Sequence, residues 1–131
     1  MATPVLKDPI PGEMFDGIDF VVQGAMKNKK GRLEPNPKPI PKKKGSKIQI
    51  GLSVKVQREI ARGQIQYFEL CCWNAAWNTA ELLDLKQDDR VNFYGRYEFE
   101  MGHTREFHKM HVNGRLQIER FSAITATPTE I

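Results

Sequence analysis

The fold is decided by one continuous stretch, Tyr67-Phe68-Glu69-Leu70-Cys71-Cys72-Trp73-Asn74-Ala75-Ala76-Trp77-Asn78. Its first half alternates as a β-strand does, since successive side chains of a strand point to opposite faces. One face carries Phe68, Leu70 and Cys72, and this uniformly apolar set predicts burial in a core. The other face carries Tyr67, Glu69, Cys71 and Trp73, and we expect it to lie toward solvent.

A short helix is expected directly after this strand, over residues 75–85. Asn74 is a favourable N-cap residue, and Ala76, Ala80 and Leu83 fall on one helical face. Asp88 and Asp89 then form a turn into the next strand. Five strands are expected in all, over residues 19–26, 48–56, 66–73, 91–100 and 105–112, with a last strand or extension over 116–121.

A helix between the third and fourth strands of a five-stranded chain is typical of the oligonucleotide-binding (OB) barrel. We therefore predict an all-β protein, a five-stranded OB-fold barrel with one short helix between strands 3 and 4. Residues 1–16 hold three prolines and predict a flexible arm, 17–121 form the domain, and 122–131 form a flexible tail. Prolines at alternate positions of 35–41 predict an extended loop that joins no β-ladder. Residues 58–63 are expected to form a turn or a short hairpin tip that ends at Gly63.

The positive charge of the chain is concentrated in one segment, residues 27–47. The whole chain of 131 residues has a net charge of +4, whereas this segment carries nine basic residues and one acidic residue. Such a basic block favours a polyanion as partner, nucleic acid being the commonest, although a solvated surface loop has the same composition.

The two cysteines are adjacent, so on a strand they would face opposite ways and could not form a framework disulfide. A reducing compartment is therefore expected. No run approaches the roughly 18 apolar residues of a membrane span, and the first 12 residues lack an apolar signal core. We expect a cytoplasmic protein that does not bind membranes, associated with the nucleoid if it is bacterial.

The candidate site combines aromatic rings with cations, as a protein that binds single strands requires. Trp73, Tyr67 and Tyr97 are the candidate base-stacking residues. The alternative for Trp73 and Tyr67 is packing under a loop or at a subunit interface, where such residues are also common. The candidate phosphate contacts are Lys29, Lys30, Arg32, Lys42, Lys43, Lys44, Arg96 and Arg105.

Catalytic and metal chemistry are not expected. His108 and His111 would point to opposite faces of their strand, and the cysteines lack the spacing of a zinc site. The sequence contains no credible nucleophile–base pair and no Gly-rich phosphate loop. We therefore expect no enzyme activity, no cofactor and no small-molecule substrate.

The stretch from Phe20 to Val112 resembles the bacterial-type single-stranded-DNA-binding protein family. Residues 20–26 take the place of the family's first strand, V-x-L-x-G-x-L. Tyr67 stands at the leading aromatic of the third strand, Trp73 at the aromatic that ends it, and Ala80-Glu81 in the helix. Residues 87–97 follow the family's K-G-x-x-V-x-V-x-G-x-L turn and strand, with Asp88-Asp89 in place of lysine and glycine.

The resemblance implies single-stranded DNA binding with little sequence preference, in replication, recombination or repair, by a homo-oligomer that is a tetramer or a dimer. This chain departs from the family in ending Ala126-Thr127-Pro128-Thr129-Glu130-Ile131, without the acidic tip that recruits partners. A replication accessory resembling primosomal protein N, which mainly bridges proteins, is one alternative, and a structural oligomeric module is another. RNA remains an alternative ligand, because stacking and phosphate contacts serve both polymers.

Overall fold

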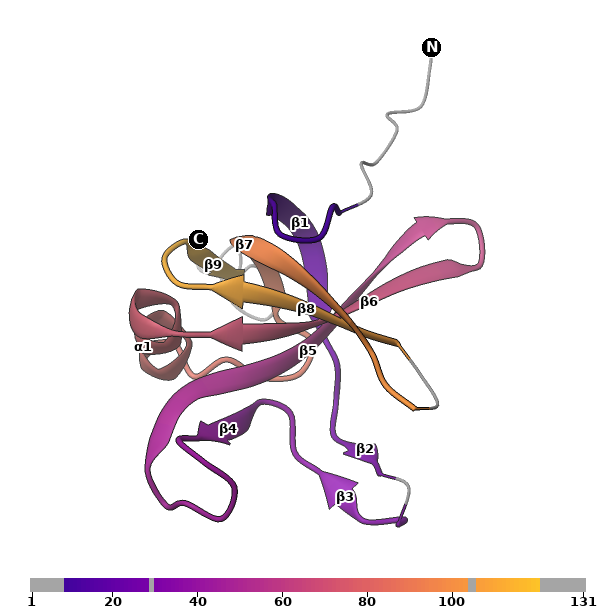
Figure 1. Cartoon of the computed structure of the whole chain (residues 1–131). Helices are drawn as coiled ribbons and strands as arrows, with labels where there is room; N and C mark the ends of the chain where they lie inside the picture. Colours follow the sequence, from indigo (N-terminus) through magenta and orange to yellow (C-terminus); the bar gives the residue numbers. More distant parts are fainter. Residues whose placement is uncertain (1–8, 29, 104–105, 121–131) are drawn as a thin grey trace, which may run out of the picture.

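The computed structural model describes residues 9–28, 30–103 and 106–120. These residues form nine strands and one helix (Figure 1). In chain order the elements are β1 (Met14–Val22), β2 (Met26–Lys27), β3 (Leu33–Glu34), β4 (Lys38–Pro41), β5 (Gln49–Ala61), β6 (Gln64–Cys72), α1 (Asn74–Leu82), β7 (Arg90–Met101), β8 (Glu106–Val112) and β9 (Leu116–Glu119).

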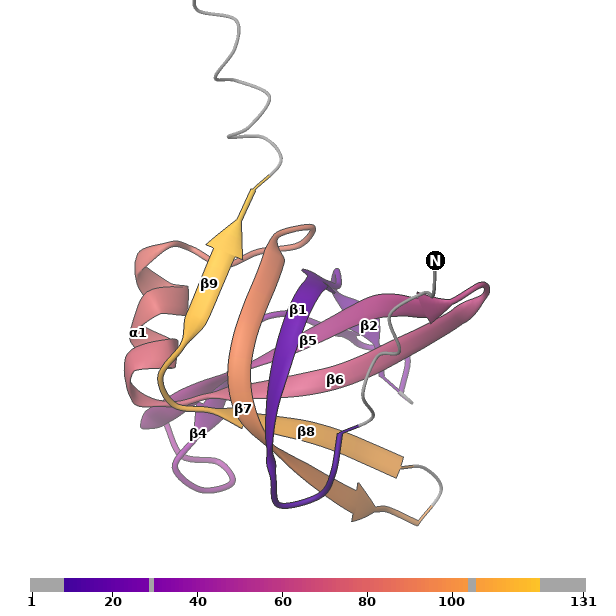
Figure 2. The same cartoon turned by 90° about the horizontal axis from the view of Figure 1, so that it is seen from above.

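The five long strands close into a barrel in the order β1-β5-β6-β8-β7, because β1 pairs with β7 as well as with β5. All these pairings are antiparallel except that of β6 with β8, which is parallel. Figure 2 shows α1 and the β5–β6 hairpin at opposite ends of the barrel. The predicted fold class is confirmed: the protein is an all-β, five-stranded barrel of the OB type with its helix between the third and fourth barrel strands.

Four phenylalanines fill the centre of the barrel. Phe15 and Phe20 come from β1, Phe68 from β6 and Phe93 from β7, and the ring centroids of neighbouring pairs lie 5.2–6.3 Å apart. Tilted aromatic pairs at such distances add attraction to the burial of their apolar area. The predicted inward face of the third barrel strand is confirmed, since Phe68, Leu70 and Cys72 are all buried in this core.

The first barrel strand begins earlier than the sequence predicts. β1 starts at Met14, which pairs with Arg96, so residues 14–16 belong to the barrel and not to an arm. The predicted strand start at Asp19 is wrong. A bulge breaks the side-chain alternation there, because the register shifts between Gly17 and Phe20 and Asp19 has φ 60°, so the residues before the bulge do not continue the pattern that follows it. The remainder of the predicted arm before residue 9, and the predicted tail 122–131, lie outside the described residues.

The proline-rich segment does join the sheet. Lys38–Pro41 forms β4, which pairs antiparallel with β5. The prediction that these prolines exclude pairing is wrong, because alternate residues of a strand direct their N–H groups to opposite sides and only one side faces the neighbouring strand. Lys42 donates its N–H to the Ile48 carbonyl at 2.8 Å, so the even-numbered residues face β5 and the odd-numbered prolines place their missing donors on the outer edge.

The predicted helix exists but ends earlier and has a different cap. Trp73 occupies the N-cap position, and Asn74 is already in the helix, with its Nδ2 donating to Asn113 Oδ1 at 2.9 Å. Ala76 and Ala80 are buried as predicted, whereas Leu83 is 45% exposed. The predicted turn at residues 58–63 also shrinks, because β5 continues to Ala61 and the chain reverses at Arg62–Gly63.

Both cysteines are buried and free, in agreement with the prediction that they form no disulfide. Burial raises the pKa of each thiol to about 12. A thiol with so high a pKa carries little thiolate at neutral pH and is chemically inert. Within the described residues, no helix has the length and apolarity needed to cross a membrane.

Gly17 offers a direct test of how tightly β1 packs on the core. A Cβ placed there would run into the ring of Phe93, whereas one at Gly114 would meet nothing within 4 Å. We expect Gly17→Ala to lower the free energy of unfolding by about 1–3 kcal/mol through overpacking, and Gly114→Ala to leave it within about 0.5 kcal/mol. Urea unfolding of both variants measures the difference. Equal stabilities would contradict the close approach of β1 to β7.

Candidate nucleic-acid interface

A groove of about 1260 Å³ crosses the outside of the barrel over β5 and β6. The β2–β3 hairpin forms one wall through Met26, Lys27, Asn28 and Glu34, and the β7–β8 hairpin forms the other through Gly102, His103, Glu106, Phe107 and His108. Lys55, Tyr67 and Glu69 lie on its floor. We call this the β5–β6 groove. Tyr67 is 52% exposed there, so part of its ring is available to a ligand.

The strand register arranges the outward side chains of β5, β6, β8 and β7 in three rows across the sheet. The first row, at one end of the sheet, consists of Gln57, Tyr67, Phe107 and Glu100. The middle row consists of Lys55, Glu69, Lys109 and Glu98. The third row is Ser53, Cys71, His111 and Arg96, with Trp73 beyond it. Tyr67 and Trp73 lie on the same outer surface, but six residues of extended strand separate them by about 20 Å.

The middle row alternates in charge, which keeps the floor of the groove close to neutral. Glu69 also accepts a hydrogen bond from Ser53 Oγ at 2.6 Å, and Lys109 lies 3.7 Å from Glu100. Opposite charges on neighbouring strands attract one another and hold the long side chains flat on the sheet. The floor therefore suits bases better than phosphates, and phosphate contacts must come from the walls.

The β2–β3 hairpin is held in place by two asparagines. Asn28 Oδ1 accepts the backbone N–H groups of Lys30 and Arg32 at 2.9 and 3.0 Å, which closes the tip. Asn36 fastens the base of the hairpin to β5: its Nδ2 donates to the carbonyls of Gln23 and Lys55, and its Oδ1 accepts the Lys55 N–H. These hydrogen bonds fix the backbone that carries Lys30 and Arg32 and fasten the base of the hairpin to the barrel.

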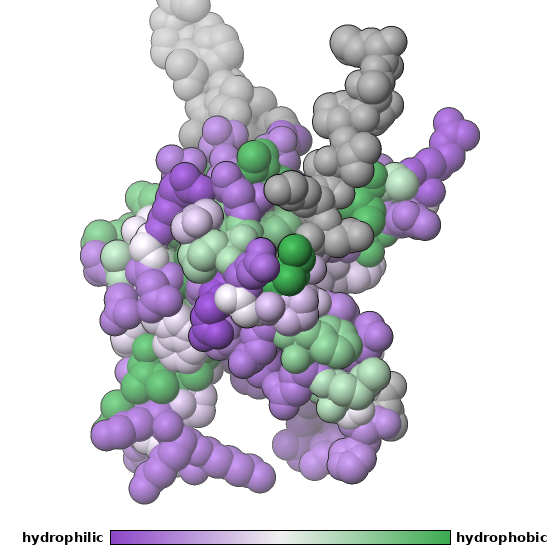
Figure 3. Space-filling view, turned by 45° about the horizontal axis from the view of Figure 1, so that its top comes forward, coloured by the Kyte–Doolittle hydropathy of each residue, from purple (hydrophilic) through white to green (hydrophobic). Residues whose placement is uncertain are grey.

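The second basic group lies on the turn between β4 and β5. Ser46 donates its N–H to the Lys43 carbonyl at 2.9 Å, and Gly45 has φ 80°, so the turn exposes Lys42, Lys43 and Lys44. Figure 1 shows this turn and the β2–β3 hairpin projecting from the same side of the barrel. Figure 3 shows hydrophilic side chains gathered on two projections at the lower side of the molecule, with a gap between them.

Trp73 is half-buried and already has a ring partner. Its ring is nearly parallel to that of His111, with centroids 6.1 Å apart, and a Cβ at Gly51 would lie 2.6 Å from its edge. Trp73 Nε1 donates to His111 Nδ1 at 3.1 Å, and His111 Nε2 is 3.0 Å from Glu98 Oε1. These two partners select the neutral tautomer that carries its proton on Nε2. This arrangement holds the orientation of Trp73.

Tyr97 does not reach the surface, so the prediction that it stacks on bases is wrong. The side chain is 5% exposed and packs edge-on against Phe68 in the core. Its hydroxyl lies 2.5 Å from His108 Nδ1, and burial followed by the charge of Glu106 raises the pKa of Tyr97. Residue 97 faces inward because Tyr94 and Arg96 face outward on the same strand.

The remaining predicted residues are distributed over four places. Tyr67 lies in the β5–β6 groove, Lys30 and Arg32 lie on the adjoining hairpin, and Lys42, Lys43 and Lys44 lie on the β4–β5 turn. Arg96 is exposed on β7 opposite His111, at the Trp73 end of the outer surface. Lys29 and Arg105 lie outside the described residues.

Sequence reasoning missed several residues of the groove, notably Lys55, Phe107 and His108. Lys55 could have been found from the alternation of its strand, since it shares a face with Ser53 and Gln57. Phe107 and His108 could not, because only the parallel pairing of β8 with β6 brings them beside Tyr67.

His108 lies on the core-facing side of β8 with Met110, whereas His111 lies on the outer side, as their spacing predicts. Among the described residues, no group of three or more His, Cys, Asp and Glu side chains is placed to hold a metal ion. No protein-family model and no curated protein matches the chain significantly. The family resemblance therefore remains a prediction.

The His111–Glu98 contact makes a testable contribution to stability. The hydrogen bond from His111 lowers the pKa of Glu98, so its stabilising effect is present above the carboxyl's ordinary pKa and disappears as the pH falls through the lowered value. Because Glu98 is exposed to solvent, we expect Glu98→Gln to cost less than about 1 kcal/mol at pH 7. The difference from the wild type should shrink as the pH falls below the ordinary pKa of a glutamate and disappear once Glu98 is protonated in the folded protein.

Urea unfolding between pH 7 and pH 3 measures this difference. Glu13→Gln, at an exposed position outside the pair, is the matched control and should follow the wild type. A Glu98→Gln effect that is independent of pH would show that the charge of the Glu98 carboxylate does not contribute to stability through this contact.

Proposed function

We propose that this protein binds single-stranded nucleic acid, with DNA as the principal ligand and little preference for sequence. The observation that carries the proposal is Tyr67, a half-exposed ring on the floor of the β5–β6 groove between walls that include a basic hairpin. Stacking on such a ring is sequence-tolerant because every base has a π-face, and it contributes about 1–3 kcal/mol per base.

The charge distribution supports a division of labour within the site. Lysines and Arg32 occupy the β2–β3 hairpin and the β4–β5 turn, whereas the floor alternates between lysine and glutamate. A strand bound with its bases on the floor would direct its phosphates toward these projections. Each phosphate contact releases condensed counterions, so the affinity should fall as salt rises.

The proposal gives different roles to Tyr67 and Trp73, the two predicted stacking residues on the outer surface. Tyr67 is the principal stacking residue. Trp73, which is held by His111, is a second contact at the far end of the bound strand. The two lie about 20 Å apart at about 3.3 Å per residue of extended chain. An OB domain covers about 4–16 nucleotides, which accommodates both. A role in replication, recombination or repair follows from this ligand and from the family resemblance.

Tyr67→Ala tests the stacking contribution. We expect its affinity for a fluorescein-labelled dT oligonucleotide of about 16 nucleotides to fall about 5- to 150-fold, corresponding to the loss of one stacked base. Tyr67→Phe should retain most of the affinity, because the ring is kept. Fluorescence anisotropy at low salt measures both variants.

Tyr94→Ala is the matched control, because Tyr94 is 43% exposed but lies outside the β5–β6 groove. It should bind as the wild type does. No saturable binding of the dT oligonucleotide by the wild type would refute the proposal, and tighter binding of a matched uridine oligonucleotide would assign the site to RNA.

The triple variant Lys42→Gln, Lys43→Gln, Lys44→Gln tests the phosphate contacts. The slope of log K against log salt changes by about 0.7 for each phosphate released, so the slope should become shallower by up to about 2. Lys86→Gln, at an exposed position of the α1–β7 connection, should leave the slope unchanged. An unaltered slope in the triple variant would remove the β4–β5 turn from the binding path.

A further inference from the structure

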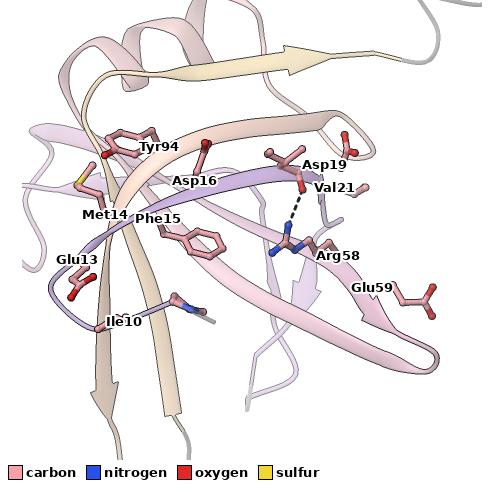
Figure 4. Close-up of a pocket in the computed structure, with 12 residues that line it drawn as sticks. Ile10, Glu13, Met14, Phe15, Asp16, Asp19, Val21, Arg58, Glu59 and Tyr94 are labelled. Carbon is pink, nitrogen blue, oxygen red and sulfur yellow. Dashed lines mark hydrogen bonds between the residues drawn. The ribbon is translucent and has the colours of Figure 1, made fainter. Parts of the chain in front are cut away.

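A second groove, of about 680 Å³, lies between β1 and the end of β5. We call it the β1 groove, and it has no lining residue in common with the β5–β6 groove. Its apolar surface includes Ile10, Met14, Ile18 and Tyr94, each exposed by between 43% and 56%. Figure 4 shows Ile10, Met14 and Tyr94 around the opening, with the Arg58 side chain directed across it toward β1. Several large apolar side chains exposed side by side are typical of an interaction site.

The groove exists because β1 and β5 separate. Their pairing is limited to Val21 with Gln57 and Val22 with Val56, next to the bulge in β1. Beyond that point the Arg58 guanidinium takes the place of a strand partner. Its Nη1 donates to the Ile18 carbonyl at 3.1 Å, and its Cζ lies 4.4 Å from the centroid of the Phe20 ring. Burial lowers the pKa of Arg58, although a guanidinium stays protonated.

The separated part of β1 presents a strand edge to the groove. In an antiparallel ladder, the backbone N–H and C=O of alternate residues point to opposite sides. The Ile18 carbonyl points toward Arg58, away from β7. Tyr94 pairs with Asp16 but donates its N–H away from β1, to the Arg115 carbonyl. The backbone groups of Asp16 therefore also point away from β7. Met14, Asp16 and Ile18 therefore direct their backbone polar groups toward the groove, where an added strand could pair with them.

The rim of the groove is acidic, although the chain as a whole is basic. Among the residues that the structure describes, four carboxylates line it, from Glu13, Asp16, Asp19 and Glu59, against one cation, Arg58. Arg115 offsets one of them through its contact with Asp16 at 2.8 Å. A symmetric pairing of two copies along this edge would bring like charges together, which is unfavourable. A cationic occupant instead complements the rim.

We propose that the β1 groove docks an extended segment of another protein in which lysine or arginine alternates with apolar residues. The segment adds to β1 as a strand, pairing with the backbone of Met14 and Asp16, as in other cases of strand addition to an open sheet edge. Its apolar side chains pack on Met14, Ile18 and Tyr94, and its cations meet Glu13 and Glu59. This surface is separate from the nucleic-acid groove, so both ligands bind at once.

The probe is a fluorescein-labelled, end-capped peptide of alternating lysine and valine, measured by anisotropy at low salt against an alternating glutamate and valine peptide. We expect saturable binding of the lysine peptide only. The double variant Glu13→Lys, Glu59→Lys should weaken it at least tenfold, whereas Glu119→Lys, an equally exposed carboxylate on β9, should not. Binding of the dT oligonucleotide to the double variant should not weaken, which separates this proposal from the first.

Amide hydrogen exchange distinguishes strand addition from charge attraction. Exchange at Met14 and Asp16 should slow when the lysine peptide is bound. Unchanged exchange, equal loss of binding in the Glu119→Lys variant, or no binding by the wild type would each overturn the proposal. It would also be overturned if Ile18→Lys turned an oligomer into a monomer in sedimentation, because the groove would then be covered by a second copy.

Discussion

The structure depends on the closure of the barrel by β1. This strand supplies two of the four central phenylalanines, Phe15 and Phe20, and pairs with β7 along most of its length but with β5 only at Val21 and Val22. Burying those two rings is worth several kcal/mol, since a fully buried aromatic side chain contributes about 1.5–3 kcal/mol. The burial requires both rings to face inward, and the bulge between Gly17 and Phe20 corrects the side-chain alternation so that they do.

Both grooves follow from this closure. Where β5 remains paired with β6, its outward side chains join those of β6 and β8 in one continuous surface, and the β2–β3 hairpin is fastened over that surface by Asn36. Where β5 leaves β1, the sheet opens and the Arg58 guanidinium covers the ring of Phe20, which stays fully buried. One barrel therefore offers a mainly neutral floor with cationic projections on one side and an acidic, apolar edge on another. The ligands proposed for the two grooves have opposite charges and would contact different residues.

The parts that were predicted correctly are those whose pattern is local. The alternation around Phe68, Leu70 and Cys72 requires only that one side of a strand be buried, and the structure buries it. The failures occur where pairing with a distant strand decides. Lys38–Pro41 joins the sheet because β5 offers an edge on which alternate prolines do no harm. Tyr97 is a failure of a different kind, because the alternation within β7 already places it on the buried side with Val91 and Phe93, beside His108.

The sequence by itself determined four of the five barrel strands, the position of the helix between them, and the concentration of lysines between residues 27 and 47, because alternation and charge are properties of adjacent residues. Only the tertiary structure decided which aromatic residues are exposed, which cations stand beside Tyr67, and that β1 parts from β5. These features depend on register and closure, which bring together segments such as β6 and β8 that are more than 30 residues apart in the chain. No pattern of adjacent residues predicts which distant segments will pair, and both candidate sites consist of residues that such pairings bring together.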